Sequence, residues 1–213
     1  MKLAVLLAMS LSLMLAACTG SLFKNKAAPP TMYWLSPMPS SAAAQPPAAA
    51  AAPAVAPTDL AILKPRVRAG LDTDRIAALY SDRRLDYFAD VRWSGPLDEV
   101  LHDVAVQQLH SDPGLRNVNA EESVFASAYW LEIEVLDFQA EYAAPDAAPT
   151  VHVHFLARVG KSADRRMMRS FEPDVHEAAA ANRMSAIVDA YYRATSEAFR
   201  QIAVGAASTI NAK

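Results

Sequence analysis

The sequence predicts an α+β domain in which one mostly antiparallel β-sheet carries two α-helices packed on one face. Several segments alternate apolar and polar residues with a period of two, which is typical of half-buried strands. Two other segments repeat apolar residues every three or four positions, as amphipathic helices do. Their order along the chain is strands, helix, strands, helix. We expect the folded domain to span residues 59–205.

The N-terminus has the pattern of a secretory signal peptide, which we place at residues 1–17. Met1-Lys2 is followed by an apolar run from Leu3 to Leu15 that is short for a membrane span. Leu15-Ala16-Ala17-Cys18 is similar to a bacterial lipobox, in which the cysteine becomes the new N-terminus and carries acyl chains such as palmitate. Cys18 is the only cysteine, so an internal disulfide is excluded. The alternatives are a secreted protein with a chance cysteine and an uncleaved anchor.

The residues after Cys18 favour one membrane. Thr19-Gly20 places no aspartate behind the lipidated residue. By similarity to Gram-negative lipoproteins, this favours a lipid-anchored protein on the periplasmic face of the outer membrane. Sorting to the inner membrane stays open.

Composition excludes some classes of protein. The net charge of −3 is far from the strongly basic balance of a nucleic-acid-binding domain. Alanine inflates the hydrophobic fraction of 53%, and beyond residue 17 no run has the eighteen or more apolar residues of a spanning helix.

Residues 18–58 read as a connecting region with one strand. Residues 19–30 are small and polar, residues 31–35 (TMYWL) look like a strand that returns to pair with the domain, and Ser36 to Asp59 is nearly all Ala, Pro and Ser. Such a composition favours extended polyproline-like states that reach roughly 70 Å. An insertion-tolerant surface loop and a recognition motif are both open.

The domain begins with strands and a helix. Strands are expected at residues 60–67, 75–81 and 84–94, and Pro65 in the first of these suggests a strand end or an edge strand. In the last of them Leu85, Tyr87 and Trp93 fall on the apolar side of the alternation. Pro96 suits the first turn of a helix over residues 97–109, which Pro113-Gly114 ends.

The second half repeats this order. Residues 126–143 carry the clearest strand alternation, and residues 150–162 and 165–178 are expected to form a hairpin with its tip at residues 160–164. A long helix follows, with an apolar stripe from Met184 to Ile202.

We find no residue pattern that points to catalysis, a metal or a cofactor, so the protein is not expected to be an enzyme. His152 and His154 lie on one face of a strand, but the sequence shows no third ligand at a useful spacing. His102 and His110 are too far apart on their helix to share a metal. No nucleophile elbow, phosphate loop or dinucleotide fingerprint is present.

Two charged regions are candidate contact surfaces. Arginines and aspartates of residues 64–93 are interleaved with aromatic residues, a mixture that protein interfaces enrich and that an ion-paired sheet face also shows. A basic hairpin tip is formed by Arg158, Lys161, Arg165 and Arg166. It would suit anionic lipid head groups or an acidic partner, or it is simply an exposed turn.

The chain resembles the ABC-type transport auxiliary lipoprotein family, the PqiC-like proteins, over most of residues 59–202. The matching features are a strand after the tether, a strand ending in proline, a Leu-Asp turn, an aromatic strand, an Arg-Trp pair and a helix-opening proline. They are Tyr33 and Leu35, Leu63 to Pro65, Leu71-Asp72 with Arg75-Ile76, Leu85 with Tyr87-Phe88, Arg92-Trp93, Pro96, and the later Asp137-Phe138. Gly95 and the long Ala/Pro stretch depart from the pattern.

The resemblance implies a non-catalytic auxiliary component of an MCE/ABC-type phospholipid transport system, with an MCE-domain protein of the ABC lipid transporter as its partner. Tyr87, Phe88, Arg92 and Trp93 are then expected near the contact, although Leu85, Tyr87 and Trp93 are equally suited to the core. The alternatives are a structural lipoprotein of another outer-membrane machine, for secretion or lipopolysaccharide export, and a periplasmic binder of apolar ligands. A homo-oligomer is left open.

Overall fold

The computed structural model describes residues 28–36, 59–115, 117–120 and 126–212. Those from Thr31 onward belong to one compact unit, Thr31–Lys213. In chain order its elements are β1 (Thr31–Tyr33), β2 (Leu60–Ile62), β3 (Arg66–Val67), β4 (Arg75–Tyr80), β5 (Leu85–Trp93), α2 (Leu97–His110), β6 (Val118–Ala120), β7 (Tyr129–Tyr142), β8 (Thr150–Lys161), β9 (Met167–Phe171), β10 (Asp174–Ala178) and α3 (Met184–Ile210).

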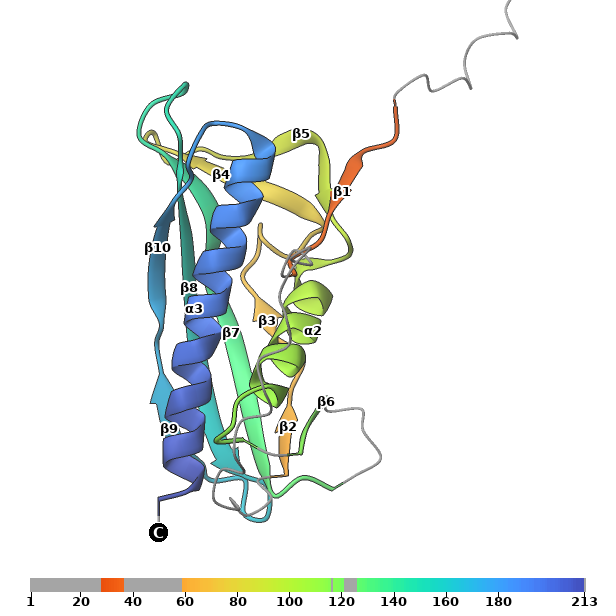
Figure 1. The fold of residues 1–213 in the computed structure, drawn as a ribbon, viewed down its shortest axis with the longest axis vertical. Coiled ribbons are helices and arrows are strands. Elements are labelled where there is room, and N and C mark those ends of the chain that lie inside the picture. The colour runs from red at the N-terminus through yellow and green to blue at the C-terminus, as the bar shows by residue number, and fades with distance from the viewer. Residues whose placement is uncertain (1–27, 37–58, 116, 121–125, 213) are drawn as a thin grey trace, which may run out of the picture. The chain divides into compact units, whose positions relative to one another are not determined.

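The predicted α+β class is confirmed, with one large mixed sheet and two helices (Figure 1). β7 and β8 form the long antiparallel ladder at its centre. The other edge of β7 pairs in parallel with β2, β3 and β4, placed one after another along its length. The other edge of β8 pairs antiparallel with β9 and β10. The sheet is therefore built from short strands laid against two long ones.

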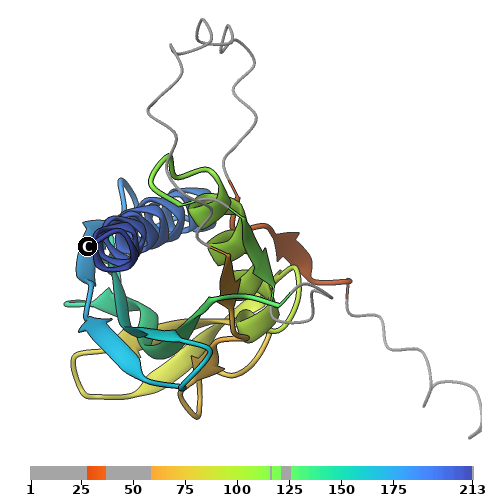
Figure 2. The same cartoon turned by 90° about the horizontal axis from the view of Figure 1, so that it is seen from below.

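The remaining strands extend the sheet on the β4 and β2 side. β5 pairs antiparallel with β4, and β1 pairs in parallel with β5, so the strand expected at residues 31–35 does join the domain. β6 pairs in parallel with β2. Figure 2 shows the sheet curving round one side while the two helices lie along the other.

The core lies between the helices and the inner face of β7 and β8. α3 packs on β8, β9 and β10, and α2 packs on α3 and β6. The inward side chains of the two long strands are fully or almost fully buried: Leu131, Ile133, Val135, Phe138, Val151, Val153, Phe155 and Val159. Burial of this surface supplies about 25 cal/mol per Å² to stability.

The alternation of inward-facing and outward-facing residues in β7 shifts by one residue near the middle of the strand. Inward residues are odd-numbered up to Val135 and even-numbered from Phe138, because a bulge shifts the register against β8 between Val135 and Asp137. A β-bulge adds one residue to a strand and re-aims the side chains that follow it. After the bulge, Asp137, Gln139 and Glu141 face outward. They continue along the strand the outer face on which Glu132 and Glu134 lie before the bulge.

Within the described residues, neither helix combines the length and the apolar character that crossing a membrane requires.

Candidate functional site

The predicted lipidation site, Cys18, and the predicted signal peptide, residues 1–17, lie outside the described residues. The Ala/Pro-rich residues 37–58 also lie outside them. The other predicted sites are all within the described unit.

The residues predicted to contact a partner lie along β5, but they do not share one environment. The Tyr87 hydroxyl donates a hydrogen bond to the Gly70 carbonyl at 2.6 Å, and the Arg75 guanidinium lies 4.0 Å from the centre of the Tyr87 ring. Phe88 instead packs against the ring of Tyr142, with ring centres 6.3 Å apart. Both side chains are half-buried and keep part of their surface open to solvent.

Trp93 belongs to the core. It is 1% exposed and makes edge-on contacts with Phe138 and Tyr191, at 5.9 and 5.1 Å between ring centres. Arg92 next to it is partly exposed and forms an ion pair with Asp74 at 3.5 Å. The part of the predicted surface that a partner can reach is therefore Tyr87, Phe88 and Arg92.

The structure adds Tyr142 to this region, where it meets Tyr80 of the charged and aromatic segment 64–93. Tyr80 stacks on Tyr142 with ring centres 5.3 Å apart, and the Arg84 guanidinium lies 4.4 Å from the centre of the Tyr80 ring. Tyr142 comes from β7, far along the chain from β4 and β5. Its place beside Phe88 depends on the parallel pairing of β4 with β7, which no local pattern indicates.

The basic tip is smaller than predicted. Lys161, Arg165 and Arg166 lie in or beside the exposed turn between β8 and β9. Arg158 does not belong to the tip, because it lies within β8 and its guanidinium is 3.1 Å from Glu132 and 3.4 Å from Glu134. Cross-strand pairing on the outer face of the sheet holds it there.

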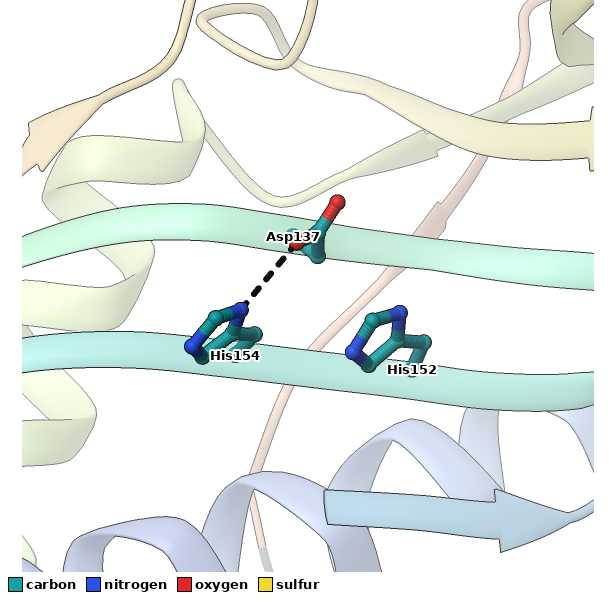
Figure 3. Close-up of side chains that lie close together, drawn as sticks. All are labelled: Asp137, His152 and His154. Carbon is teal, nitrogen blue, oxygen red and sulfur yellow. Dashed lines mark hydrogen bonds and ion pairs between the residues drawn. The ribbon is translucent and has the colours of Figure 1, made fainter. Parts of the chain in front are cut away.

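A cluster of histidines and carboxylates occupies the same outer face, beyond the bulge. His152 and His154 on β8 lie opposite Gln139 and Asp137 of β7, and His176 of β10 lies opposite His152. The side chains of Asp137, His152 and His154 gather on this face (Figure 3).

The histidine rings are arranged in a row with carboxylates between and beside them. His154 Nδ1 is 3.3 Å from Asp137 Oδ2. The His152 ring is nearly parallel to that of His154, with ring centres 6.0 Å apart, and stacks on His176 at 4.0 Å. Among the described residues, two groups could hold a metal ion: Asp137 with His152 and His154, and Glu141 with His152 and His176.

The remaining histidines of the sequence analysis are separate. His102 of α2 is buried, and its Nε2 lies 3.0 Å from the Ile62 carbonyl oxygen, so it ties α2 to β2. His110 is exposed at the end of α2.

Clearly shifted pKa values are found for groups on α3 and at the end of β7. Hydrogen bonds from Arg200, and then from Gln201, lower the pKa of Glu197 on α3 to about 2. Burial raises the pKa of Tyr191 well above its ordinary value, and burial also raises that of Tyr142.

Comparison with known proteins identifies the family. The family model described as "ABC-type transport auxiliary lipoprotein component" matches residues 41–203. The chain belongs to this family. The resemblance seen in the sequence is thereby confirmed. Its family makes the protein an auxiliary lipoprotein of ABC-type transport. The family is not a known enzyme family.

Solved structures share the fold of this auxiliary lipoprotein. A crystal structure of a protein from Xanthomonas campestris has a TM-score of 0.64 at 21% identity and covers 70% of this chain and 83% of its own. A second crystal structure, of a protein described as uncharacterized, has a TM-score of 0.62 at 15% identity, with 84% and 99% covered. At these identities the likeness shows the fold alone. No curated protein matches the chain.

Proposed function

We propose that this auxiliary lipoprotein is a non-catalytic part of an MCE/ABC-type phospholipid transport system, held on the periplasmic face of the outer membrane by acyl chains on Cys18. The observation that carries the proposal is the family match over residues 41–203. The lipobox-like Leu15-Ala16-Ala17-Cys18 supports the anchor, and Thr19-Gly20 after it supports the outer membrane. The MCE-domain partner follows from the resemblance of the domain to its family.

In this proposal the domain acts by being held near its partner. Each buried methylene of an acyl chain adds about 0.8 kcal/mol to membrane attachment, so several chains keep the protein at the surface. Confinement raises the effective concentration of the domain for a partner in the same space. Tyr87, Phe88 and Arg92 are the proposed contact residues, because partly exposed aromatic and arginine side chains are the types that interfaces enrich.

Affinity capture from the native envelope tests the proposal. The tagged, lipidated protein is purified from its own cell envelope, and the proteins that accompany it are identified by mass spectrometry. We expect an MCE-domain protein, and we expect less of it with the unanchored Cys18→Ala variant. Capture of an outer-membrane secretin or barrel with no MCE-domain protein would contradict the proposal.

Surface variants locate the contact. Arg92→Glu reverses a partly exposed charge on β5, and Arg200→Glu makes the same change on α3. We expect at least a tenfold loss of the captured partner for Arg92→Glu and little change for Arg200→Glu. Equal capture by both variants would place the contact elsewhere on the domain.

A further inference from the structure

We propose that Asp137, His152 and His154 form a binding site for a divalent transition-metal ion of the zinc class on the outer face of the β7–β8 ladder. The inference does not depend on the proposed role in transport. One ligand atom from each of the three residues lies within 4.8 Å of the other two (Figure 3).

The strand geometry explains how three ligands converge. His152 and His154 are two residues apart on β8, so their side chains leave the same face of the sheet. Asp137 lies directly opposite His154 on β7 because the bulge shifts the register there. Directly opposed residues of an antiparallel pair have Cβ atoms about 4.5–5.5 Å apart, which is within reach of a shared ion.

Burial favours this group over the second one. The side chains of Asp137, His152 and His154 are 25%, 15% and 20% exposed, whereas that of His176 is 50% exposed. Partly buried ligands lose less side-chain freedom when they bind an ion. We therefore assign the ion to Asp137, His152 and His154, and His176 serves as the comparison residue.

Neighbouring side chains hold the ligands in place. Glu172 Oε1 is 3.1 Å from His154 Nε2, the ring nitrogen on the side away from Asp137. A carboxylate on the second ring nitrogen orients a metal-bound histidine and raises its basicity. The buried Gln139 amide donates a hydrogen bond to Asp137 Oδ1 at 3.2 Å and accepts one from the Phe138 N–H at 2.8 Å.

The other charged groups around the site either favour the binding of a cation or compete with it. His152 lies between Glu141 Oε1, 2.8 Å from its Nδ1, and Asp174 Oδ1, 2.9 Å from its Nε2. These carboxylates favour a cation. The exposed Arg68 competes weakly, since its Nη1 is 3.8 Å from Asp137 Oδ1, while Oδ2 faces His154.

The donor atoms select the class of ion. Two imidazole nitrogens and one carboxylate oxygen suit Zn²⁺ and similar first-row ions, whereas Ca²⁺ and Mg²⁺ prefer oxygen ligands. Zn–N and Zn–O bonds of about 2.0–2.2 Å require the ligand atoms to approach one another to roughly 3.3 Å. Side-chain rotation supplies this movement, and water completes the coordination.

Zinc titration of the full-length protein tests the assignment. The lipidated, tag-free protein in detergent is stripped with a chelator and titrated with ZnCl₂ by calorimetry, and CoCl₂ absorption reports the coordination geometry. We expect one equivalent of saturable binding and a Co²⁺ band typical of a four- or five-coordinate site. His154→Ala and Asp137→Asn should each weaken Zn²⁺ binding at least tenfold, and Glu172→Gln about tenfold.

His176→Ala is the matched control, because it removes the neighbouring histidine outside the proposed ligand set. We expect it to change the affinity less than threefold. An equal loss in His176→Ala and His154→Ala, or no saturable Zn²⁺ binding by the unaltered protein, would overturn the assignment. Circular dichroism and thermal melting of each variant without metal separate loss of ligand from loss of fold, and Asp137→Asn keeps the size of the replaced side chain.

Discussion

Phe88 and Trp93 show that neighbouring aromatic residues of one strand can serve different purposes. Both belong to the aromatic segment of β5 that resembles the family pattern. Phe88 is half-buried against Tyr142, whereas Trp93 is enclosed between Phe138 and Tyr191. Side-chain type alone does not separate an interface residue from a core residue, and burial does.

The two residues should therefore respond differently to truncation. We expect Trp93→Ala to lower the free energy of unfolding by about 3–5 kcal/mol, because it leaves a large cavity. Phe88→Ala should cost clearly less, since its ring is already partly solvated. Urea denaturation of both variants measures the difference, and equal losses would mean that Phe88 is as much a core residue as Trp93.

At the residue scale, the sequence predicted that His152 and His154 share a face but showed no third ligand. The missing residue, Asp137, belongs to a strand that was predicted. Its direction depends on the bulge at Val135–Asp137, which reverses the inward and outward positions of everything after it. A one-residue shift of this kind moves each side chain to the other face, and the alternation of the first half of the strand does not reveal it.

The packing of the β8–β9 hairpin depends on a glycine, Gly160, at a position where a Cβ atom would not fit. A Cβ at Gly160 would lie 2.2 Å from the Trp130 ring and 2.7 Å from the Arg166 carbonyl oxygen. The Trp130 Nε1–H also donates a hydrogen bond to the Lys161 carbonyl at 3.1 Å. Trp130 therefore lies across the strand at this point and leaves room only for glycine.

We expect Gly160→Ala to destabilise the fold by about 1–3 kcal/mol, because the backbone or Trp130 must move. Gly95→Ala is the matched control, since a Cβ there would lie 3.9 Å from the Glu99 and Val100 side chains, and its effect should stay within about 0.5 kcal/mol. Chemical denaturation measures both. A neutral result for Gly160→Ala would show that Trp130 can leave its position at little cost.

The long helix α3 is joined to the sheet by a buried polar contact. The Tyr191 hydroxyl donates a hydrogen bond to the Ala77 carbonyl of β4 at 3.0 Å. Burial raises the pKa of this hydroxyl well above 10.0. In the unfolded chain the hydroxyl ionises near pH 10, but in the folded protein it stays protonated.

The stability of the protein should therefore fall in alkali. Below pH 10 the tyrosine is protonated in both states, and above pH 10 the unfolded state loses a proton that the folded state retains. We expect the free energy of unfolding to drop by up to about 1.4 kcal/mol per pH unit for this group. Denaturation at pH 9 to 11 should show that the free energy of unfolding falls less steeply with pH in Tyr191→Phe than in the unaltered protein. Tyr142, whose pKa is also raised by burial, should account for part of the fall that remains. An unchanged slope would contradict the assignment to Tyr191.

Elements with a strong local pattern were predicted well. Both helices and the long strands lie where the periodicity placed them, and α3 continues beyond Ile202 to Ile210. The segment 60–67 divides into β2 and β3 before Pro65 and after it, and residues 165–178 divide into β9 and β10 at Pro173. Proline cannot donate to a strand ladder, which accounts for both breaks. The short β6 was not predicted.

At the scale of the whole molecule, the sheet depends on pairings between distant segments. β2, β3 and β4 align in parallel along one edge of β7, although the residues that pair lie more than sixty positions apart in the chain. A period of two predicts that a segment is a strand, but it does not indicate which strand will be its neighbour. For the same reason the aromatic cluster of Tyr80, Phe88 and Tyr142 could not be assembled from the sequence.

The pairing of β1 with β5 also divides the connecting region into two parts. β1, before residues 37–58, and β2, after them, belong to the same unit. We expect an insertion of about 20 Gly/Ser residues there to leave partner capture unchanged, whereas the same insertion within residues 19–30 should alter it. Pull-down yields for the two insertions measure this, and equal effects would contradict the division.

If Cys18 carries acyl chains as proposed, the distance between the domain and the bilayer depends on a short segment of the chain. In that case residues 19–30 would separate the membrane surface from β1. A chain of that length spans at most about 40 Å when fully extended. The Ala/Pro-rich residues 37–58 come after β1 in the chain, so their length would not add to this distance, and β1 would lie within about 4 nm of the lipid surface.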